Sequence, residues 1–328
     1  MDLIYYESIG DTLYGKARYV YIGVDIGDRY IREFTEDKFI KAPIVLNRTK
    51  VSLAQAVNIS KCSRADLMMI AVPQTSIDQF KKPNDVICPM RLHQVIDVSM
   101  HHEKCLGFMS KRESKRYNKL IERYDYDISK HPRDFVNFYK KMHKPTMIGR
   151  YGNFARSVDI KKAFFDIFRK GQLFYIKNND QYVAGSVSII DGDTVNARLI
   201  GVLNGDNHYL KDGAQNFVYH AIIHWACNND VIKKVDFQGC EPFLTKSTYQ
   251  YKSRMGTKII IPKNEFGDKR LIIRTSGSKP AIDFMINNPA IGISDTEELC
   301  AVYTAMPDGK YRSDIPYNKN GIGSHIII

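Results

Sequence analysis

The feature that most limits how this chain of 328 residues can fold is a series of three extended segments joined by two polar turns. The segments cover residues 173–176, 182–190 and 194–202, and the turns are Asn178-Asn179-Asp180 and Asp191-Gly192-Asp193. Runs of β-branched and aromatic residues bounded by Asn, Asp and Gly are typical of antiparallel strands joined as hairpins. The sequence therefore predicts a meander of three antiparallel strands.

Helix and strand patterns alternate on both sides of this meander. Apolar residues recur at helical spacing behind a capping box at Ser110 and Glu113, behind His131, from about 157 to 170, and from about 212 to 228. After the last of these helices we expect a strand at 235–237, a helix at 249–255 and a strand at 258–261. This alternation predicts an α/β fold with a mixed sheet flanked by helices.

The rest of the chain carries weaker patterns. We expect buried strands at 19–24, 42–46 and 67–73, a helix near 51–59, a strand at 271–274 and a helix at 281–286. The last twenty or so residues are rich in Pro, Gly and Asn, so an irregular tail is expected. The predicted domains are 1–108, 109–262 and 263–328.

Positive charge is concentrated in one part of the sequence. The net charge is +12, and residues 104–170 hold 18 Lys and Arg against 7 Asp and Glu. Such a segment is either a solvated surface or a wall facing a polyanion, such as tRNA, the phosphates of an acyl carrier or an anionic membrane. No apolar run approaches the roughly 20 residues of a membrane span, and no secretory signal begins the sequence. Six cysteines without a C-x-x-C pair indicate reduced thiols, so we expect a cytoplasmic protein without a zinc ribbon.

The order of elements resembles the core of the GNAT acyltransferase superfamily, and in particular its Fem-type (FemAB-like) branch. The segments that carry the resemblance are 150–155, 183–186, 210–214, 236–239 and 251–256. The resemblance implies an N-acyltransferase that moves an acyl or aminoacyl group from acyl-CoA, an acyl carrier protein or aminoacyl-tRNA to an amine, with no bound cofactor. Fem-type proteins often carry two GNAT-like halves, so residues 1–105 are a candidate degenerate first half.

Donor binding is expected where the meander leads into the helix at Asp212. Unpaired N–H groups at the start of a helix attract phosphates and carboxylates. The residues expected there are Gly205, Lys211, Gly213 and Ala214. If the neighbouring strands part at this point, an extended carrier could pair with the exposed strand edge. Of the GNAT pyrophosphate loop, Q/R-x-x-G-x-G/A, only Gly213 is in place, so CoA use and tRNA use both stay open.

Five charged residues are candidates for catalysis or for binding the substrates, and Gly239 is a further candidate for binding. Asp236 could orient the amine or accept its proton, or it could cap the turn at Gly239. Glu241 is the second carboxylate in reach, with a surface role as the alternative. Arg150, between Gly149 and Gly152, could clamp an anionic substrate from an exposed loop. Lys252 and Arg254 could hold phosphate or carboxylate, or could be ordinary charges on a helix face.

Three other motifs have competing interpretations. His220 and His224 have the spacing of metal ligands, but helix packing is the simpler interpretation in the absence of a third ligand. Cys240 beside Gly239 is expected to be a buried thiol rather than a nucleophile. The sequence Gly23-Val24-Asp25-Ile26-Gly27 is similar to the first phosphate loop of actin-like ATPases, although Asp28 after it would repel phosphate. At the level of function, the alternative to an acyltransferase is a non-catalytic GNAT-like module that binds tRNA, an anionic membrane or a protein.

Overall fold

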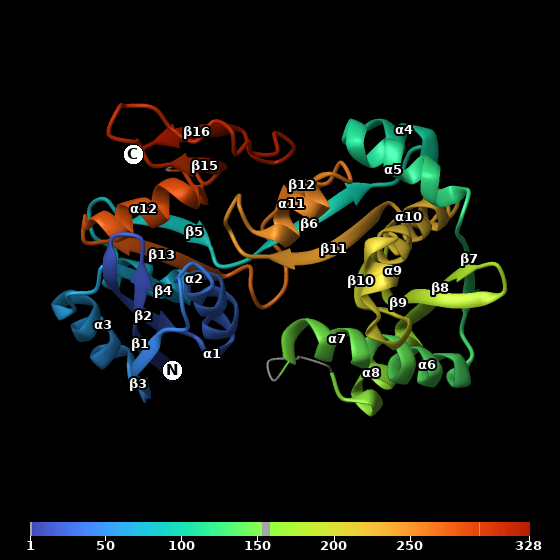
Figure 1. The fold of residues 1–328 in the computed structure, drawn as a ribbon, viewed down its shortest axis with the longest axis horizontal. Helices are drawn as coiled ribbons and strands as arrows, with labels where there is room; N and C mark the ends of the chain where they lie inside the picture. The colour runs from blue at the N-terminus through green and yellow to red at the C-terminus, as the bar shows by residue number, and fades with distance from the viewer. Residues whose placement is uncertain (1, 153–157, 295) are drawn as a thin grey trace. The chain divides into compact units, whose positions relative to one another are not determined.

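The computed structural model of the protein describes residues 2–152, 158–294 and 296–328 (Figure 1). The chain divides into two compact units. Unit 1 comprises residues 1–93, 239–251 and 259–328, and unit 2 comprises residues 94–238 and 252–258. These limits differ from the three predicted ranges, because strands that are far apart in the sequence pair with one another. The strand at 269–275, for example, lies between two strands from the first ninety residues.

Unit 1 is built on a six-stranded sheet with the order β3-β1-β2-β4-β13-β5. Its strands are β1 Leu3–Thr12, β2 Gly15–Gly23, β3 Ile44–Val51, β4 Leu67–Pro73, β5 Val86–Pro89 and β13 Lys269–Thr275. β2 runs parallel to β4, and the other neighbouring pairs are antiparallel. Its helices are α1 Asp25–Gly27, η1 Asp28–Arg32, α2 Glu33–Glu36, α3 Leu53–Cys62, η2 Gln74–Gln79 and α12 Lys279–Asn287. Apolar clusters form on both faces of this sheet, so its central strands are buried.

A small sheet completes unit 1. It consists of β14 Ala290–Ile293, β15 Leu299–Tyr303 and β16 Ser324–Ile327. β14 is antiparallel to β15, and β16 is parallel to it. The expectation of a wholly irregular tail is therefore wrong for the last residues, since an apolar stretch at the end of the tail adds a strand to β15.

Most of the predicted elements of unit 1 are confirmed, with one clear error. The strands expected at 19–24, 67–73 and 271–274 and the helix at 281–286 correspond to β2, β4, β13 and α12. The strand predicted at 42–46 instead begins at Ile44, and it is exposed rather than buried. An apolar run indicates a strand but does not say whether that strand lies in the middle of a sheet or at its edge, and β3 is an edge strand.

Unit 2 contains the predicted meander. β7 Asp125–Ser129, β8 Gly171–Asn178, β9 Gln181–Asp191 and β10 Thr194–Val202 are antiparallel neighbours, and β11 Lys234–Cys240 follows β10 in parallel. The complete seven-stranded sheet has the order β12-β6-β11-β10-β9-β8-β7, with β6 Leu92–Asp97 and β12 Lys258–Ile260. The division between the two units runs through β6, β11, β12 and the helix α11 Ser247–Ser253.

Helices cover this sheet. They are α4 His102–Gly107, α5 Lys111–Ile121, α6 Pro132–Phe138, η3 Tyr139–His143, α7 Lys144–Tyr151, α8 Ile160–Asp166, η5 Phe168–Lys170, η6 Leu203–Gly205, α9 Asn207–Lys211 and α10 Ala214–Cys227. Aromatic residues of α6, η3, α8 and η5 pack against β8 and β9. The helix expected from Asp212 begins at Ala214, because Gly213 adopts a left-handed conformation with φ of 90° and separates α10 from the preceding α9. The predicted start at Ser157 lies outside the described residues.

Both sheets thus follow one plan, in which antiparallel strands lead to a parallel neighbour, as expected for two GNAT-like halves. Within the described ranges, no helix is both long and apolar enough to cross a bilayer.

Candidate functional site

The two parallel strands of unit 2 pair only at their beginnings. β10 and β11 are in register at Thr194–Lys234, Val195–Val235 and Asn196–Asp236. β10 continues to Val202, and along the described residues it has no further pair with β11. We call the place where the two strands diverge the fork. The divergence predicted for the last strand of the meander is therefore present.

Four polar residues meet at the fork. Gln238 has a left-handed backbone conformation with φ of 66°, which is uncommon for a residue other than glycine. The Asp236 carboxylate accepts a hydrogen bond from the Gln238 backbone amide at 2.6 Å, and the Lys252 ammonium donates to the Gln238 carbonyl at 2.9 Å. The Gln238 side-chain amide donates to Asn196 Oδ1 at 3.2 Å. The structure therefore brings Asp236 and Lys252 together, as the prediction of one site requires.

Both charged groups at the fork are buried. Asp236 is 8% exposed and Lys252 is 6% exposed. The alternative interpretation of Lys252 as an ordinary surface charge is therefore wrong, since charged side chains are rarely buried without specific partners. For Asp236 the structure shows the capping contact that was the alternative to catalysis, made to Gln238 just before Gly239.

The β10 edge beyond the fork is partly used by side chains of unit 2. Thr146 accepts a hydrogen bond from the Val202 amide at 2.9 Å and donates to the Val202 carbonyl at 3.3 Å. His143 Nδ1 donates to the Ile200 carbonyl at 3.0 Å. The Ile200 carbonyl and both backbone groups of Val202 are thus already paired, so an extended carrier could not pair with the whole edge. The strand edge expected to receive a carrier is therefore only partly available.

The first turn of α10 lies next to Arg150. The Arg150 guanidinium donates a hydrogen bond of 2.6 Å to Gln215 Oε1, on the second residue of α10. Gly213 precedes this turn and, having no side chain, provides no cap for its amides. Arg150 is exposed, as expected, but it lies in the last turn of α7 rather than in a loop. Residues 153–155 of the predicted motif lie outside the described residues.

The other donor-side candidates are more scattered. Gly205 has φ of 67° and packs against the backbone of Pro145, which leaves no room for a side chain. Ala214 is buried in α10, and Lys211 is exposed on α9. Arg254 is half-buried just after α11, and its carbonyl accepts a hydrogen bond from the Ser110 amide.

Glu241 and Gly239 belong to unit 1. Glu241 is 4% exposed and forms ion pairs with Arg91 at 3.1 Å and Lys246 at 3.5 Å. The expected surface role for this carboxylate is therefore wrong: it balances two cations in the interior of unit 1. Gly239 lies against the Arg91 guanidinium, which a side chain at this position would meet at 2.5 Å. Cys240 is buried, as expected.

A buried polar cluster in unit 2 was missed by the sequence analysis. Glu113 accepts hydrogen bonds from Asn216 at 2.5 Å and His220 at 3.0 Å, and all three are at least 97% buried. Ser110 caps α5 as predicted, but Glu113, expected to complete the capping box, points into the core instead. His224 forms a hydrogen bond of 2.8 Å with the Tyr126 hydroxyl. Both histidines thus have packing partners, and within the described ranges no group of three or more metal-ligating side chains is found.

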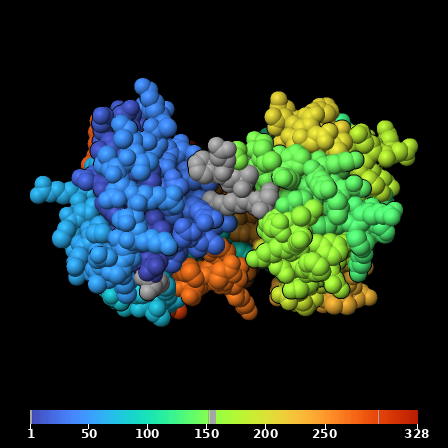
Figure 2. All heavy atoms as spheres, turned by 90° about the horizontal axis from the view of Figure 1, so that it is seen from below, coloured from blue at the N-terminus to red at the C-terminus, as the bar shows by residue number. Residues whose placement is uncertain are grey.

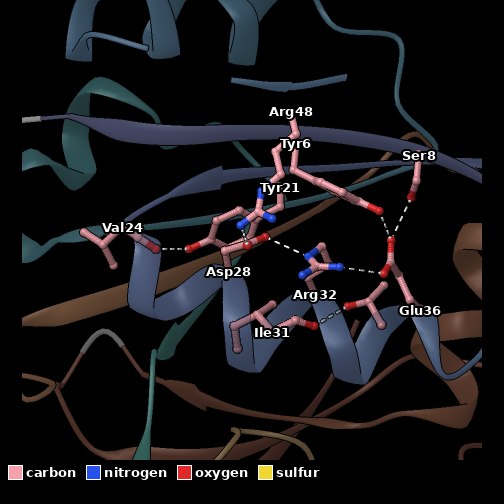
Figure 3. Close-up of polar contacts among 10 residues, drawn as sticks. Tyr6, Ser8, Tyr21, Val24, Asp28, Ile31, Arg32, Glu36 and Arg48 are labelled. Atoms are coloured by element: carbon pink, nitrogen blue, oxygen red, sulfur yellow. Dashed lines mark hydrogen bonds and ion pairs between the residues drawn. The ribbon is translucent and has the colours of Figure 1, made fainter. Parts of the chain in front are cut away.

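The candidate phosphate loop of unit 1 is part of a closed ion-pair network (Figure 3). Asp28 is fully buried and accepts hydrogen bonds from Arg32 and Arg48, each at 2.9 Å. Arg32 continues to Glu36 at 3.1 Å, and Glu36 accepts from Tyr6 and from Ser8. Burial and the hydrogen bond to Glu36 raise the pKa of Tyr6 to about 12. The arginines of this region already pair with acidic side chains, so they do not form a site for a phosphate.

Basic side chains cover much of unit 2. Nearly all Lys and Arg residues described within 104–170 are exposed, and Arg123 pairs with Asp212. In Figure 2 the green and yellow-green part of the chain, which includes this segment, forms most of the visible face of the unit. The predicted concentration of charge is therefore a surface feature.

No family model matches the sequence, and no curated protein matches it. Among solved structures, FemX is 11% identical over 82% of this chain and 83% of that chain, with a TM-score of 0.42. The protein named L-PGS from Bacillus licheniformis is 12% identical over 84% and 86%, with a TM-score of 0.40. A GCN5-related N-acetyltransferase-like protein from Streptococcus suis is 10% identical over 82% of each chain, with a TM-score of 0.30. Since these scores are low, the GNAT-like assignment of the fold rests on the strand order and pairing described above.

Proposed function

We propose that this protein transfers an acyl or aminoacyl group from an activated carrier to an amine. The observation that carries the proposal is the fork, where β10 and β11 pair for three residues and then diverge, with α10 in the connection between them. In a sheet of this plan, diverging strands and the start of the connecting helix create a place for an activated carbonyl. The likenesses to FemX and to GNAT proteins agree with the fold but carry none of this argument.

The reaction needs few groups once both substrates are held in line. The amine nitrogen attacks the carbonyl carbon of a thioester or ester, and the carrier leaves with the bonding electron pair. The developing oxyanion requires a hydrogen-bond donor, a part that the buried Lys252 ammonium is suited to play. The Asp236 carboxylate is the candidate to accept the proton lost by the amine. Arg150 at the first turn of α10 is the candidate to hold the phosphates of the donor.

The donor class follows from the occupied β10 edge. His143 and Thr146 already pair with the Ile200 carbonyl and with both backbone groups of Val202, which reduces the pairing available to a pantetheine-like strand. The exposed basic segment would instead favour a polyanionic carrier. We therefore propose aminoacyl-tRNA before acyl-CoA as the donor, and expect its binding to weaken steeply as salt is raised.

The experiment compares donors and one matched pair of variants. The full chain is incubated with labelled aminoacyl-tRNA or labelled acetyl-CoA and a mixture of amines, and transfer to amine is measured. Asp236→Asn should lower the transfer rate by at least a hundredfold, since general-base contributions are about 10²–10⁴-fold. Asp230→Asn, at an exposed aspartate of unit 2, should leave it unchanged. Absence of transfer from every donor, with retained salt-dependent binding of tRNA, would favour the non-catalytic module instead.

A further inference from the structure

Unit 1 contains a cavity that the proposed transfer reaction does not use. It is a groove of about 800 Å³ between β5, α12 and the small sheet of β14, β15 and β16. This volume lies within the range of about 300–1,000 Å³ that is usual for small-molecule sites. Its apolar lining includes Ile87, Ile273, Ile282, Met285, Val302 and Ile326. The groove is therefore large enough to hold a ligand of substantial size.

The apolar part of the lining is aliphatic, and Asn84, Thr275 and Ser294 are among its polar residues. Among the residues described around the groove there is no aromatic ring, no histidine and no arginine. Val302 and Ile326 are register partners on adjacent parallel strands, and Ile328 lies on the same face as Ile326 because side chains alternate along a strand. Flat heteroaromatic ligands are commonly held by stacking on aromatic or guanidinium planes, which this groove does not offer. A flexible aliphatic chain suits it better.

One of the residues that line the groove carries a buried hydroxyl without a protein partner. Thr304 is 8% exposed, and its Oγ1 has no hydrogen-bond partner among the residues that the structure describes. Leaving a buried hydroxyl unpaired is unfavourable, so such a group indicates a missing partner. A ligand with a polar group at the end of an aliphatic chain would supply this partner.

The charge at the rim favours an anion. Lys81 lines the groove and is exposed. The carboxylate of Asp85, the one acidic side chain among the described lining residues, is held by Arg274 through contacts of 2.9 Å and 2.8 Å. Because this carboxylate is already neutralised, the net charge that the groove presents to a ligand is positive.

We propose that this groove binds a single-chain anionic amphiphile, with its aliphatic chain against the isoleucines and its carboxylate near Lys81 and Thr304. This would be a ligand site of unit 1, separate from transfer at the fork, and its test does not require any transfer activity.

The first measurement is calorimetric titration of the full chain with three amphiphiles, each below its critical micelle concentration. Dodecanoate should bind, and octanoate should bind about two orders of magnitude more weakly, since each buried methylene contributes about fourfold. Dodecyltrimethylammonium has the same chain with a cationic head and should bind at least tenfold more weakly than dodecanoate. Equal binding of the cation and the anion would overturn the proposal.

The second measurement uses variants of the groove. Ile282→Trp, at a half-buried position on α12, should fill the groove and weaken dodecanoate binding at least tenfold, whereas Val231→Trp on the surface of unit 2 should not. Lys81→Ala and Thr304→Val should each weaken binding about threefold or more, with Lys61→Ala as the matched control. If Ile282→Trp does not fold, as judged by circular dichroism, the Lys81 and Thr304 variants decide the result. Unchanged binding in the groove variants would overturn the proposal, as would displacement of dodecanoate by an extended peptide of alternating valine and threonine.

Discussion

The two units share a plan of strands and differ where the parallel pair ends. In unit 1, β2 pairs with β4 from Tyr19–Leu67 to Gly23–Ala71, and Gly23 is the last residue of β2. The Val24 amide then donates to the Ala71 carbonyl at 3.0 Å and extends the contact beyond the strand. In unit 2 the equivalent pairing of β10 with β11 stops after three of the nine residues of β10. The parallel pair of unit 1 therefore stays paired to the end of β2, and we call it the closed pair. The parallel pair of unit 2 separates before β10 ends, and we call it the open pair.

The difference changes what the neighbouring polar groups do. In unit 1 the helical segment after β2 satisfies its own charges, since Asp28, Arg32 and Glu36 bind one another (Figure 3). In unit 2 the diverging strand leaves backbone groups that side chains must satisfy, and it brings the buried Asp236 and Lys252 to Gln238. A closed pair stabilises the fold, whereas an open pair creates a place where a ligand can be bound. The proposed donor site therefore belongs to unit 2.

The largest expected effect tests the closed pair. Asp28→Ala removes the acid that two arginines share in the interior of unit 1, and breaking a buried ion pair costs about 3–5 kcal/mol. Asp25→Ala, in an exposed pair with Arg29 on the same segment, should change the free energy of unfolding by less than about 1 kcal/mol. Urea unfolding with peptide-resolved hydrogen exchange measures both variants.

The segments in which hydrogen exchange rises are as informative as the loss of free energy of unfolding. Exchange should rise in β2, β4 and α2 of the Asp28 variant, and β8 and β9 should keep their protection. Equal destabilisation by the Asp25 and Asp28 substitutions would show that the network contributes nothing beyond a surface ion pair.

The sequence was most informative where periodicity and turn chemistry agree. The meander, the helix cap at Ser110 and the strands β2, β4 and β11 follow from local patterns. Local patterns do not reveal pairing between distant segments, so the insertion of β13 between β4 and β5 could not be predicted from them. For the same reason the partners of Glu113 and Glu241 were missed, since Glu113 is 107 residues from His220 and Glu241 is 150 residues from Arg91.

For the candidate site, the sequence indicated which residues lie together better than it indicated what surrounds them. Asp236 and Lys252 do meet at one place, because the end of a strand and the following helix are both close to Gln238. The occupation of the β10 edge by His143 and Thr146 depends on how η3 and α7 pack against that strand. The spacing of residues in the sequence does not predict this contact.

A second prediction compares the cysteines of the two units. In unit 2 the sulfur atoms of Cys105 and Cys227 lie 3.3 Å apart, and the hydrogen bond from Cys227 lowers the pKa of Cys105. In unit 1 burial raises the pKa of Cys88. Oxidised glutathione should therefore oxidise the unit 2 pair to a disulfide, with release of two glutathione thiols, and leave Cys88 reduced. This link between α4 and α10 should stabilise unit 2 by about 2–4 kcal/mol.

Mass spectrometry and thermal unfolding measure this prediction. Oxidation should remove two thiols, raise the melting temperature of the wild-type chain and have neither effect on Cys227→Ser. Cys62→Ser, at an exposed cysteine outside the pair, should respond to oxidation as the wild type does. Loss of the Cys88 thiol under the same conditions would contradict the proposed difference between the units.

The smallest expected effect is the pH dependence of stability, which should differ between the two units. Burial, followed by the nearby His224 and His220, lowers the pKa of His102 from 6.5 to about 4. Because the unfolded chain then takes up this proton at a higher pH than the folded chain, unit 2 should lose stability as the pH falls from 6.5 towards 4. Burial opposes ionisation of Glu113, but hydrogen bonds from His220 and Asn216 lower its pKa overall, so its contribution is lost in the same direction at lower pH.

His102→Phe should flatten the pH dependence between 6.5 and 4 while keeping an aromatic ring against Tyr117 and His224. Hydrogen exchange in α4 and α10 at pH 7, 6 and 5 measures the effect, after correction for the intrinsic exchange rate at each pH. Protection of β2 and β4 in unit 1 serves as the internal reference. An unchanged pH dependence in the variant would mean that other groups cause the acid sensitivity of unit 2. His102 would then have a packing role alone.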